Sequence, residues 1–445
     1  MFLLSLGIGQ SFFNKVVGNE EGFQSARSYA IGQTHFMNSN TSTMALRNPA
    51  KLGFIQEGIK LDFNISGFMY NERRSINLQD YFEDFLTEGD YVFDNNFYNY
   101  NQFGILANYE IFFMNFGFSF SHGPWSSLDY RYEEEVRGSA SFDDGIIGIR
   151  DPLVGYHILE HNGQIDLTSF GLGVGINERI SLGLGINSLH DGSYNYLMKS
   201  IQIGESSENL APIIDSDGAI NFDGDIFASI SGIFKTSGLE FSIGYEQSAE
   251  IKDNSGILYP ILSDISGLPL YVLPIFINEQ GVLDYIDPSN PSEFTNQDFT
   301  LSYLEHLYIE KPEKFKIGFN HQEGSNVNYR LFSLEIIKNT FENIFYKDYY
   351  KINLGIEYVK HNRVLRSGIS YKQSSFQTSY LSPLTTFSFG TSKTVNKLNF
   401  DISASYSYQK YKYHDLFPVQ DDVRPDFDNV HESNWSLIST ISYTF

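Results

Sequence analysis

The sequence predicts an all-β chain, a transmembrane antiparallel β-barrel of about 14 strands with long extracellular loops. Apolar side chains recur at every second position in many runs, as on a strand with one lipid-facing side. Aromatic residues make up 16% of the chain, yet the mean hydropathy is only −0.25. No run approaches the ~20 consecutive apolar residues of a spanning helix, so strands that close on themselves must make any membrane crossing.

Charge and cysteine content exclude several classes of protein. With 54 acidic against 30 basic residues, the net charge is −24, which argues against a nucleic-acid partner because such partners are bound by clustered Lys and Arg. The acidic side chains are expected in solvated outer loops. The chain has no Cys and therefore neither disulfides nor thiolate metal sites, and we expect no cofactor. A single large barrel accommodates all 445 residues as one unit.

The N-terminus has a short apolar core followed by small and polar residues, but it lacks a basic region before that core. We interpret residues 1–14 as the remnant of a secretory signal peptide. The alternative is an ordinary buried segment of the mature chain.

The last eleven residues predict the closing strand of the barrel. Large apolar side chains stand at Trp435 and Leu437 and continue to the final residue. This ending resembles the C-terminal signal by which outer-membrane barrels are recognised for insertion. The candidate signal residues are Ile441, Tyr443 and Phe445.

Short polar turns between alternating runs give the strand count. Residues 170–176 and 180–186 alternate around the turn at residues 177–179, which is a hairpin pattern. Similar turns lie at residues 113–115, 236–238, 323–326, 361–363 and 395–397. Barrels of this kind have short periplasmic turns, so six hairpins give twelve strands with both chain ends periplasmic. An opening strand at residues 59–69 and the closing strand complete fourteen, and residues 128–138 and 194–203 are expected to form strand extensions or hairpins above the membrane.

Long outer loops are expected between these hairpins and are candidate binding regions. They are predicted at residues 71–101, 122–163, 190–218, 252–310 and 411–433. The stretch 257–282 is unusually apolar for a solvated loop, and it is either a small core of its own or an apolar capture surface. The candidate ligand-capture residues are Ile257, Tyr259, Leu268, Leu270, Tyr271, Leu273 and Phe276. Aromatic residues within 91–100 form a second candidate surface.

The segment before the first strand carries a family resemblance. A small-residue element from Ser25 to Gly32 precedes a polar stretch that ends in Asn48, Pro49, Ala50 and Leu52. This pattern resembles the N-terminal hatch of the FadL/OMPP1/TodX-like outer-membrane transporters and their PorV-like relatives, although Gln33 stands where a second Gly is common. The resemblance implies a hatch at residues 15–58 inside a barrel at residues 59–445. Packing this plug and gating a channel would use the same four motif residues.

The resemblance also implies a location and a function. We expect an outer-membrane channel of a Gram-negative-type bacterium, not an enzyme, that takes up small hydrophobic molecules such as long-chain fatty acids and releases them sideways or past a moving plug. The alternative is a PorV-like barrel that binds a protein of type 9 secretion or surface attachment. A channel should have an apolar, ligand-sized cavity open to the outside. A partner-binding barrel should be filled and should present an extended outer surface.

Inward-facing charges follow from the alternation and favour a salt-bridge network against the plug, with a catalytic or ion-relay role as the alternative. These residues are Lys60, Asp62, Glu240, Glu246, Lys316, Glu335, Glu357, Arg366, Lys372 and Asp401. The glycines Gly171, Gly173 and Gly175 share one face of a strand and are expected to make room for the plug.

Other candidate chemistry is weaker. His157, Glu160 and His161 match the His-x-x-Glu-His zinc pattern, but that chemistry needs a helix and none is predicted there. The acidic pieces at residues 143–145 and 421–428 have oxygen ligands that suit Ca²⁺, or they are solvated loops. We expect no metal site and no catalytic residue.

Overall fold

The structure is a computed structural model in which most of the chain is described. The described residues are 22–55, 58–79, 82, 84–138, 152–204, 210, 216–253, 259–264, 269–272, 299–304, 308–325, 327–342, 347–361, 363–375, 382–413 and 428–445. The predicted signal remnant at residues 1–14 and the acidic pieces at 143–145 and 421–427 lie outside them.

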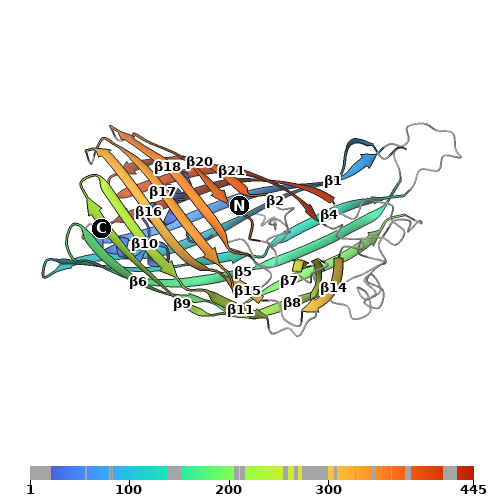
Figure 1. Ribbon diagram of the computed structural model, residues 1–445, viewed down its shortest axis with the longest axis horizontal. Coiled ribbons are helices and arrows are strands. Elements are labelled where there is room, and N and C mark those ends of the chain that lie inside the picture. The colour runs from blue at the N-terminus through green and yellow to red at the C-terminus, as the bar shows by residue number, and fades with distance from the viewer. Residues whose placement is uncertain are drawn as a thin grey trace.

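Fourteen strands of this described part close into one antiparallel barrel, as the sequence predicts (Figure 1). Each strand pairs with its neighbours in the chain order given below, and the ring closes where Leu61 of the first strand pairs with Tyr443 of the last. The strands are β1 (Gly58–Gln79), β2 (Phe85–Ile111), β3 (Met114–Ser127), β5 (Leu153–Gly175), β6 (Ile180–Leu189), β9 (Ile226–Thr236), β10 (Leu239–Glu246), β16 (Glu313–Gly324), β17 (Tyr329–Thr340), β18 (Tyr349–Lys360), β19 (Arg363–Lys372), β20 (Leu384–Val395), β21 (Leu398–Tyr413) and β22 (Asp428–Thr444).

The six predicted short turns are confirmed, and they lie at the same end of the barrel as the C-terminus (Figure 1). They connect β2 to β3, β5 to β6, β9 to β10, β16 to β17, β18 to β19 and β20 to β21. By the rule that short turns are periplasmic, this end faces the periplasm. The opposite end is therefore the extracellular end.

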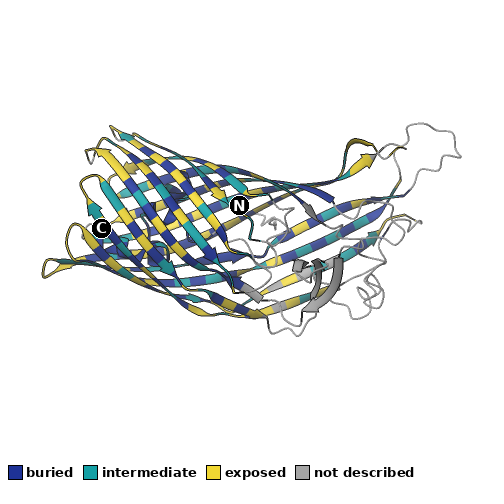
Figure 2. Ribbon diagram, in the orientation of Figure 1, coloured by how far each residue is buried: buried dark blue, intermediate teal, exposed yellow. Residues whose placement is uncertain are grey.

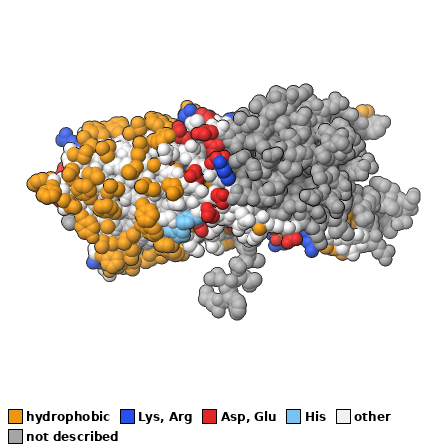
Figure 3. Space-filling view, turned by 90° about the horizontal axis from the view of Figure 1, so that it is seen from below, with side chains coloured by type: hydrophobic (Ala, Val, Ile, Leu, Met, Phe, Trp, Pro, Cys, Tyr) orange, Lys and Arg blue, Asp and Glu red, His pale blue; other side chains and the backbone are white. Residues whose placement is uncertain are grey.

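Burial alternates along the barrel strands with the period of two that a wall with a filled lumen requires (Figure 2). In the closing strand Leu437 is 55% exposed, whereas its neighbours Ser436 and Ile438 are buried. The outward apolar side chains form a belt bordered by acidic residues on the extracellular side (Figure 3). The predicted insertion-signal residues Ile441, Tyr443 and Phe445 all face outward in this belt. No helix within the described ranges has the length and apolarity to cross a membrane.

Strands continue far above the belt where the sequence predicted loops. Residues 71–101 are mostly strand, because β1 and β2 stay paired up to Gln79 and Phe85, so this loop prediction was wrong. Above the membrane both strand faces meet water or protein, so polar residues no longer distinguish strand from loop. The predicted extensions at 128–138 and 194–203 are confirmed as two of five outer strands that continue the wall. These strands are β4 (Tyr130–Arg137), β7 (Gly192–Gln202), β8 (Ser216–Asp223), β11 (Ala249–Asp253) and β15 (Tyr308–Lys311).

The N-terminal segment lies inside the barrel as four short helical turns. It packs against the inner faces of strands from most of the wall, and most of its side chains are buried. We call its described part, residues 22–55, the hatch. Its elements are α1 (Ala26–Ala30), α2 (His35–Asn38), α3 (Met44–Arg47) and the 3₁₀ helix η2 (Pro49–Phe54).

Candidate functional site: the hatch, the chamber above it and a seam in the wall

Glycines on three neighbouring strands let the hatch backbone touch the wall. A Cβ added at Gly173 would lie 2.4 Å from the carbonyl oxygen of Pro49, and one at Gly183 would lie 2.1 Å from the backbone nitrogen of Ala50. Similar close approaches occur at Gly117, Gly171, Gly175 and Gly185. Any side chain at these positions would overlap the hatch. The predicted role of the strand glycines, making room for the plug, is confirmed.

The motif residues Asn48, Pro49, Ala50 and Leu52 lie in the tightest part of this contact, and all are buried. The Asn48 side-chain amide donates to the Phe36 carbonyl and to Ser242 Oγ, both at 2.9 Å. The Ala50 amide donates to Ser231 Oγ at 2.8 Å, and its carbonyl accepts from Ser181 Oγ at 2.6 Å. The motif therefore attaches the end of the hatch to β6, β9 and β10.

Wall carboxylates hold the hatch backbone from inside the barrel. Asp62 accepts from the backbone N–H and the hydroxyl of Ser42 at 2.7 and 2.8 Å. Glu335 accepts from the backbone N–H groups of Phe36 and Met37 at 2.9 and 3.2 Å. The N–H groups at the start of a helical turn have no acceptor within the helix. In the docked hatch these carboxylates accept their hydrogen bonds, in place of the water that an undocked hatch would bind.

An ion network fixes the first helix to the wall. Arg27 lies 2.8 Å from Glu357, and Arg366 lies 2.5 Å from Glu357 and 2.6 Å from Asp401. The four side chains come from α1, β18, β19 and β21, and the three wall members are almost fully buried. The ten charged residues predicted to face inward are all buried or half-buried, and most of them contribute to such contacts.

Replacing Glu357 with Gln should destabilise the folded protein, because the buried Arg366 and the half-buried Arg27 would lose their shared, fully buried carboxylate. Breaking a buried pair costs about 3–5 kcal/mol. We expect this loss in urea unfolding from phospholipid vesicles. The control is Asp348→Asn in the exposed Lys338–Asp348 pair, which should leave the unfolding midpoint unchanged. Equal losses in both variants would contradict the network.

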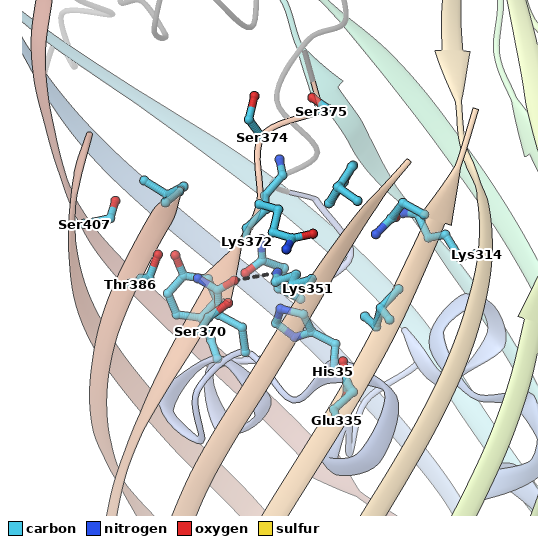
Figure 4. A pocket seen from close by; sticks show the side chains of 18 of the residues that line it. His35, Lys314, Glu335, Lys351, Ser370, Lys372, Ser374, Ser375, Thr386 and Ser407 are labelled. Atoms are coloured by element: carbon cyan, nitrogen blue, oxygen red, sulfur yellow. Dashed lines mark hydrogen bonds between the residues drawn. The ribbon is translucent and has the colours of Figure 1, made fainter. Parts of the chain in front are cut away.

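A chamber of about 150 Å³ lies on the extracellular side of the hatch (Figure 4). Its lining includes five cationic side chains, which come from the hatch and from β16, β18 and β19, against the acidic Glu335 and Glu432. Lys351 Nζ donates to the hatch residue Gln33 at 2.7 Å. Aromatic rings of Tyr29, Tyr70 and Tyr349 also face this space. The cations are Arg47, Lys314, Lys316, Lys351 and Lys372.

His35 lies in the hatch under this chamber, and its Nδ1 is 2.9 Å from Ser28 Oγ. Burial, with Arg47 and Lys351 nearby, holds the pKa of His35 well below its ordinary range. His35 therefore stays neutral in the docked hatch at a pH where an undocked His would take a proton. Docking should consequently weaken as the pH falls below about 6.5.

Hydrogen exchange of residues 22–55, corrected for intrinsic rates, measures this pH dependence. Protection should fall between about pH 7 and pH 5.5 in the native chain. It should be much flatter over this interval in a His35→Gln variant. A native chain with constant hatch protection would contradict the assignment.

The wall has a seam between β2 and β3. The ladder between them ends at the pair Phe103 and His122, and β2 above this point has no ladder partner on that side among the described strands. Pro124, just beyond the last pair, has no N–H to donate, and the pairing of β3 with β5 shifts register between Pro124 and Ser126. Higher up, side chains of β2 bridge to β4, with Asn96 donating to the Arg131 carbonyl at 2.9 Å.

The first described residues of the hatch fill the inner side of this seam. Gly22 packs so tightly that a Cβ would lie 1.5 Å from the Pro124 carbonyl oxygen. Only about 10 Å³ remains between this segment, β1, β2 and Pro124. Arg47 holds the segment in place, donating from Nη2 to the Gly22 carbonyl at 2.9 Å and from Nε to the Phe23 carbonyl at 3.1 Å. Arg47 therefore belongs both to the chamber and to the contact that closes the seam.

The predicted ligand-capture residues lie partly within and partly outside the described part of the chain. Tyr259, Leu270 and Tyr271 lie in a separate sheet of β12 (Tyr259–Asp264), β13 (Pro269–Val272) and β14 (Phe299–Leu304). Ile257, Leu268, Leu273 and Phe276 lie outside the described residues.

The aromatic side chains of residues 91–100, the second predicted surface, point to opposite sides of the wall. Phe93 and Phe97 point outward. Tyr98 and Tyr100 pack inside with Phe68, Tyr70 and the hatch residue Tyr29, beside the seam. These inner rings lie between the chamber and the seam.

The zinc-like motif lies on a strand. His157, Glu160 and His161 belong to β5, where His157 and His161 point to the buried face and Glu160 lies on the other. His157 Nδ1 is 3.4 Å from Glu134 of β4. Among the described side chains, no group of three or more His, Asp or Glu is arranged to hold a metal ion.

A closed antiparallel barrel with an outer apolar belt, a charged lumen and an internal hatch defines an outer-membrane β-barrel protein. Among solved structures, a FadL homologue of Pseudomonas aeruginosa is similar over 99% of this chain and 100% of that chain, with 13% identity and a TM-score of 0.54. The chain therefore has the FadL-type fold.

Two toluene transporters have the same fold. TodX of Pseudomonas putida aligns over 96% of this chain and 99% of its own, with 12% identity and a TM-score of 0.53. TbuX of Ralstonia pickettii aligns over 96% and 99%, with 11% identity and a TM-score of 0.51. No protein-family model matches the chain. No curated protein matches it in sequence.

Proposed function

We propose that this protein is an outer-membrane channel for the uptake of small hydrophobic molecules, and that long-chain fatty acids are its substrates. The FadL-type fold supports the first part, since its solved relatives include a FadL homologue and two toluene transporters. The chamber supports the second, because its cations suit a carboxylate and its tyrosine rings suit the adjoining hydrocarbon.

The chamber differs from the apolar, ligand-sized cavity expected of a channel, because cationic side chains line it. Its volume of about 150 Å³ is below the roughly 300–1,000 Å³ of typical ligand pockets. It therefore receives the head group and the first part of the chain. The remainder of a long acyl chain requires space that the hatch and the Tyr98 and Tyr100 rings now occupy.

The contacts of Arg47, which lines the chamber and also binds the carbonyls of Gly22 and Phe23, suggest how a ligand opens the seam. A carboxylate in the chamber competes with the carbonyl oxygens of Gly22 and Phe23 for the Arg47 guanidinium, and a charged acceptor is the stronger one. Gly22 and Phe23 are then released from the inner side of the seam. The hydrocarbon can leave sideways beside Pro124, where the described residues of β2 and β3 form no hydrogen-bond ladder that must be broken. The motif residues from Asn48 to Leu52 keep the rest of the hatch attached to the wall.

The experiment compares two ligands that share a hydrocarbon tail. Lys351→Gln together with Lys372→Gln should weaken binding of oleate roughly tenfold or more, about 1.4 kcal/mol, because charge-assisted contacts to the carboxylate are lost. Binding of oleyl alcohol should be nearly unchanged. Isothermal titration of the purified protein measures both affinities. Equal weakening for the two ligands, or none, would contradict recognition of a carboxylate.

A second candidate function, a PorV-like barrel that binds a secretion-system protein, is favoured by a different observation. The hatch fills much of the lumen, and the outer strands β4, β7, β8, β11 and β15 extend one side of the wall well above the belt. Such a surface suits a protein partner. This candidate predicts a stoichiometric protein partner rather than a bound lipid-like molecule.

A further inference from the structure

The periplasmic turn between β2 and β3 has an unusual composition. Its two central residues are Phe112 and Phe113, both in the left-handed region with φ of 50° and 67°. Two-residue hairpin turns of this geometry favour Gly, which has no Cβ to crowd the backbone, and Asn, whose short polar side chain can hydrogen-bond locally. Both phenyl rings are almost fully exposed, at 87% and 91%. The equivalent turn between β20 and β21 carries the polar pair Asn396 and Lys397.

This turn projects beyond the strands on either side of it. On one side β1 begins at Gly58, opposite Asn108, and on the other side β5 ends at Gly175, opposite Asn115. The tip between Asn108 and Asn115 therefore has no neighbouring described strand. In Figure 1 this light-blue hairpin reaches further than the other turns at the periplasmic end.

The apolar belt continues without a break onto this tip. Along β2 the outward side chains run from Phe103 through Ile105, Tyr109 and Ile111, each at least 37% exposed, to Phe113. Apolar side chains also cover the extreme end of the molecule in Figure 3. Continuity with the lipid-facing surface indicates that the tip meets the same solvent as the belt, which is lipid.

We propose that the Phe112 and Phe113 turn is a membrane anchor that inserts into the periplasmic leaflet of the outer membrane. Phenyl rings in lipid account for a strained, apolar pair at a position where Asn and Gly would be easier to accommodate. Because the other turns do not reach as far, the anchor draws the β2 and β3 side of the barrel into the bilayer. This is the side that carries the seam at its extracellular end.

A spin label at the tip tests the anchor directly, since the chain has no native Cys. The Phe113→Cys variant carries a nitroxide and is reconstituted into phosphatidylethanolamine and phosphatidylglycerol vesicles. Collision rates with oxygen, which partitions into lipid, and with a water-soluble nickel chelate report its depth. We expect oxygen to dominate at position 113, and the nickel chelate to dominate in the control Lys397→Cys. Equal nickel accessibility at both positions would place the tip in water, free for a soluble partner, and would overturn the proposal.

A second variant separates anchoring from folding. Phe112→Asn combined with Phe113→Gly has a turn sequence that suits the backbone, so the heat-modifiable mobility of the folded barrel should be retained. A label at Tyr109→Cys should become several-fold more accessible to the nickel chelate in this background than with the native turn. Unchanged accessibility in the folded variant would show that the rings do not hold the hairpin in the bilayer.

Discussion

Valine at position 183 should displace the hatch and convert the closed barrel into a leaky one. A Cβ at Gly183 meets the backbone nitrogen of Ala50 at 2.1 Å and the carbonyl carbon of Pro49 at 2.2 Å, and neither atom can rotate away. Overpacking of this kind costs about 1–3 kcal/mol. The overlap exists only in the docked state and raises the free energy of that state alone, so the fraction of undocked hatch should rise roughly 5- to 150-fold.

Single-channel conductance in planar bilayers measures that displacement. The matched control is Gly232→Val in β9, where an added Cβ meets nothing nearer than Leu182 Cδ2 at 3.4 Å on the outer face. The two variants add the same atoms to neighbouring parts of the wall. Open events should therefore become frequent only in Gly183→Val. A closed Gly183→Val barrel, or equal leakage in both, would show that the glycine contact does not hold the hatch.

Alanine at position 47 should release the segment that closes the seam. Arg47 makes two hydrogen bonds from a charged group to the carbonyls of Gly22 and Phe23. Losing them should cost about 2 kcal/mol or more, which corresponds to a roughly thirtyfold increase in the released population. Gln24, only 5% exposed in the docked hatch, is the reporter. A Gln24→Cys variant should react with a water-soluble maleimide about thirtyfold faster when Arg47 is Ala.

Two controls distinguish release of this segment from general loosening. Arg47→Lys keeps the charge but cannot reach both carbonyls with a planar fork, so labelling should rise only partly. In the native background, oleate should accelerate labelling of Gln24→Cys more than oleyl alcohol does, because only oleate has a carboxylate for Arg47. If oleate did not accelerate the labelling of Gln24→Cys, ligand binding in the chamber would not release the segment at the seam, and the proposed coupling would be contradicted.

The barrel could be predicted from sequence because two simple features, alternating apolar residues and short periplasmic turns, describe a membrane-spanning wall. Period-two alternation and short polar turns fixed fourteen strands, and the same alternation identified inward charges such as Glu357 and Asp401 correctly. The glycines at 171, 173 and 175 predicted the close contact with the plug. Each of these features is set by residues that lie close together in the sequence, so it can be recognised from one sequence alone.

The strand extensions above the membrane were harder to predict. Outside the bilayer, polar residues are tolerated on both faces of a strand, so residues 71–101 have the composition of a loop while forming part of β1 and β2. The chamber and the seam depend on contacts between distant positions. Arg47 and Lys372 are far apart in sequence yet line one space. Pro124 is a local sequence feature that could have indicated the seam, because a Pro cannot donate to a ladder, but it was not identified from the sequence.

The central claim is that the barrel carries a hydrophobic molecule rather than a protein partner. Native mass spectrometry of the protein extracted gently from its own membranes tests this claim most directly, because it reads bound small molecules and co-purifying chains together. The account predicts substoichiometric fatty acids, retained by the native chain and lost when Lys351 and Lys372 are both Gln. A stoichiometric protein partner on a barrel without such a molecule would contradict it and favour a role in secretion or surface assembly.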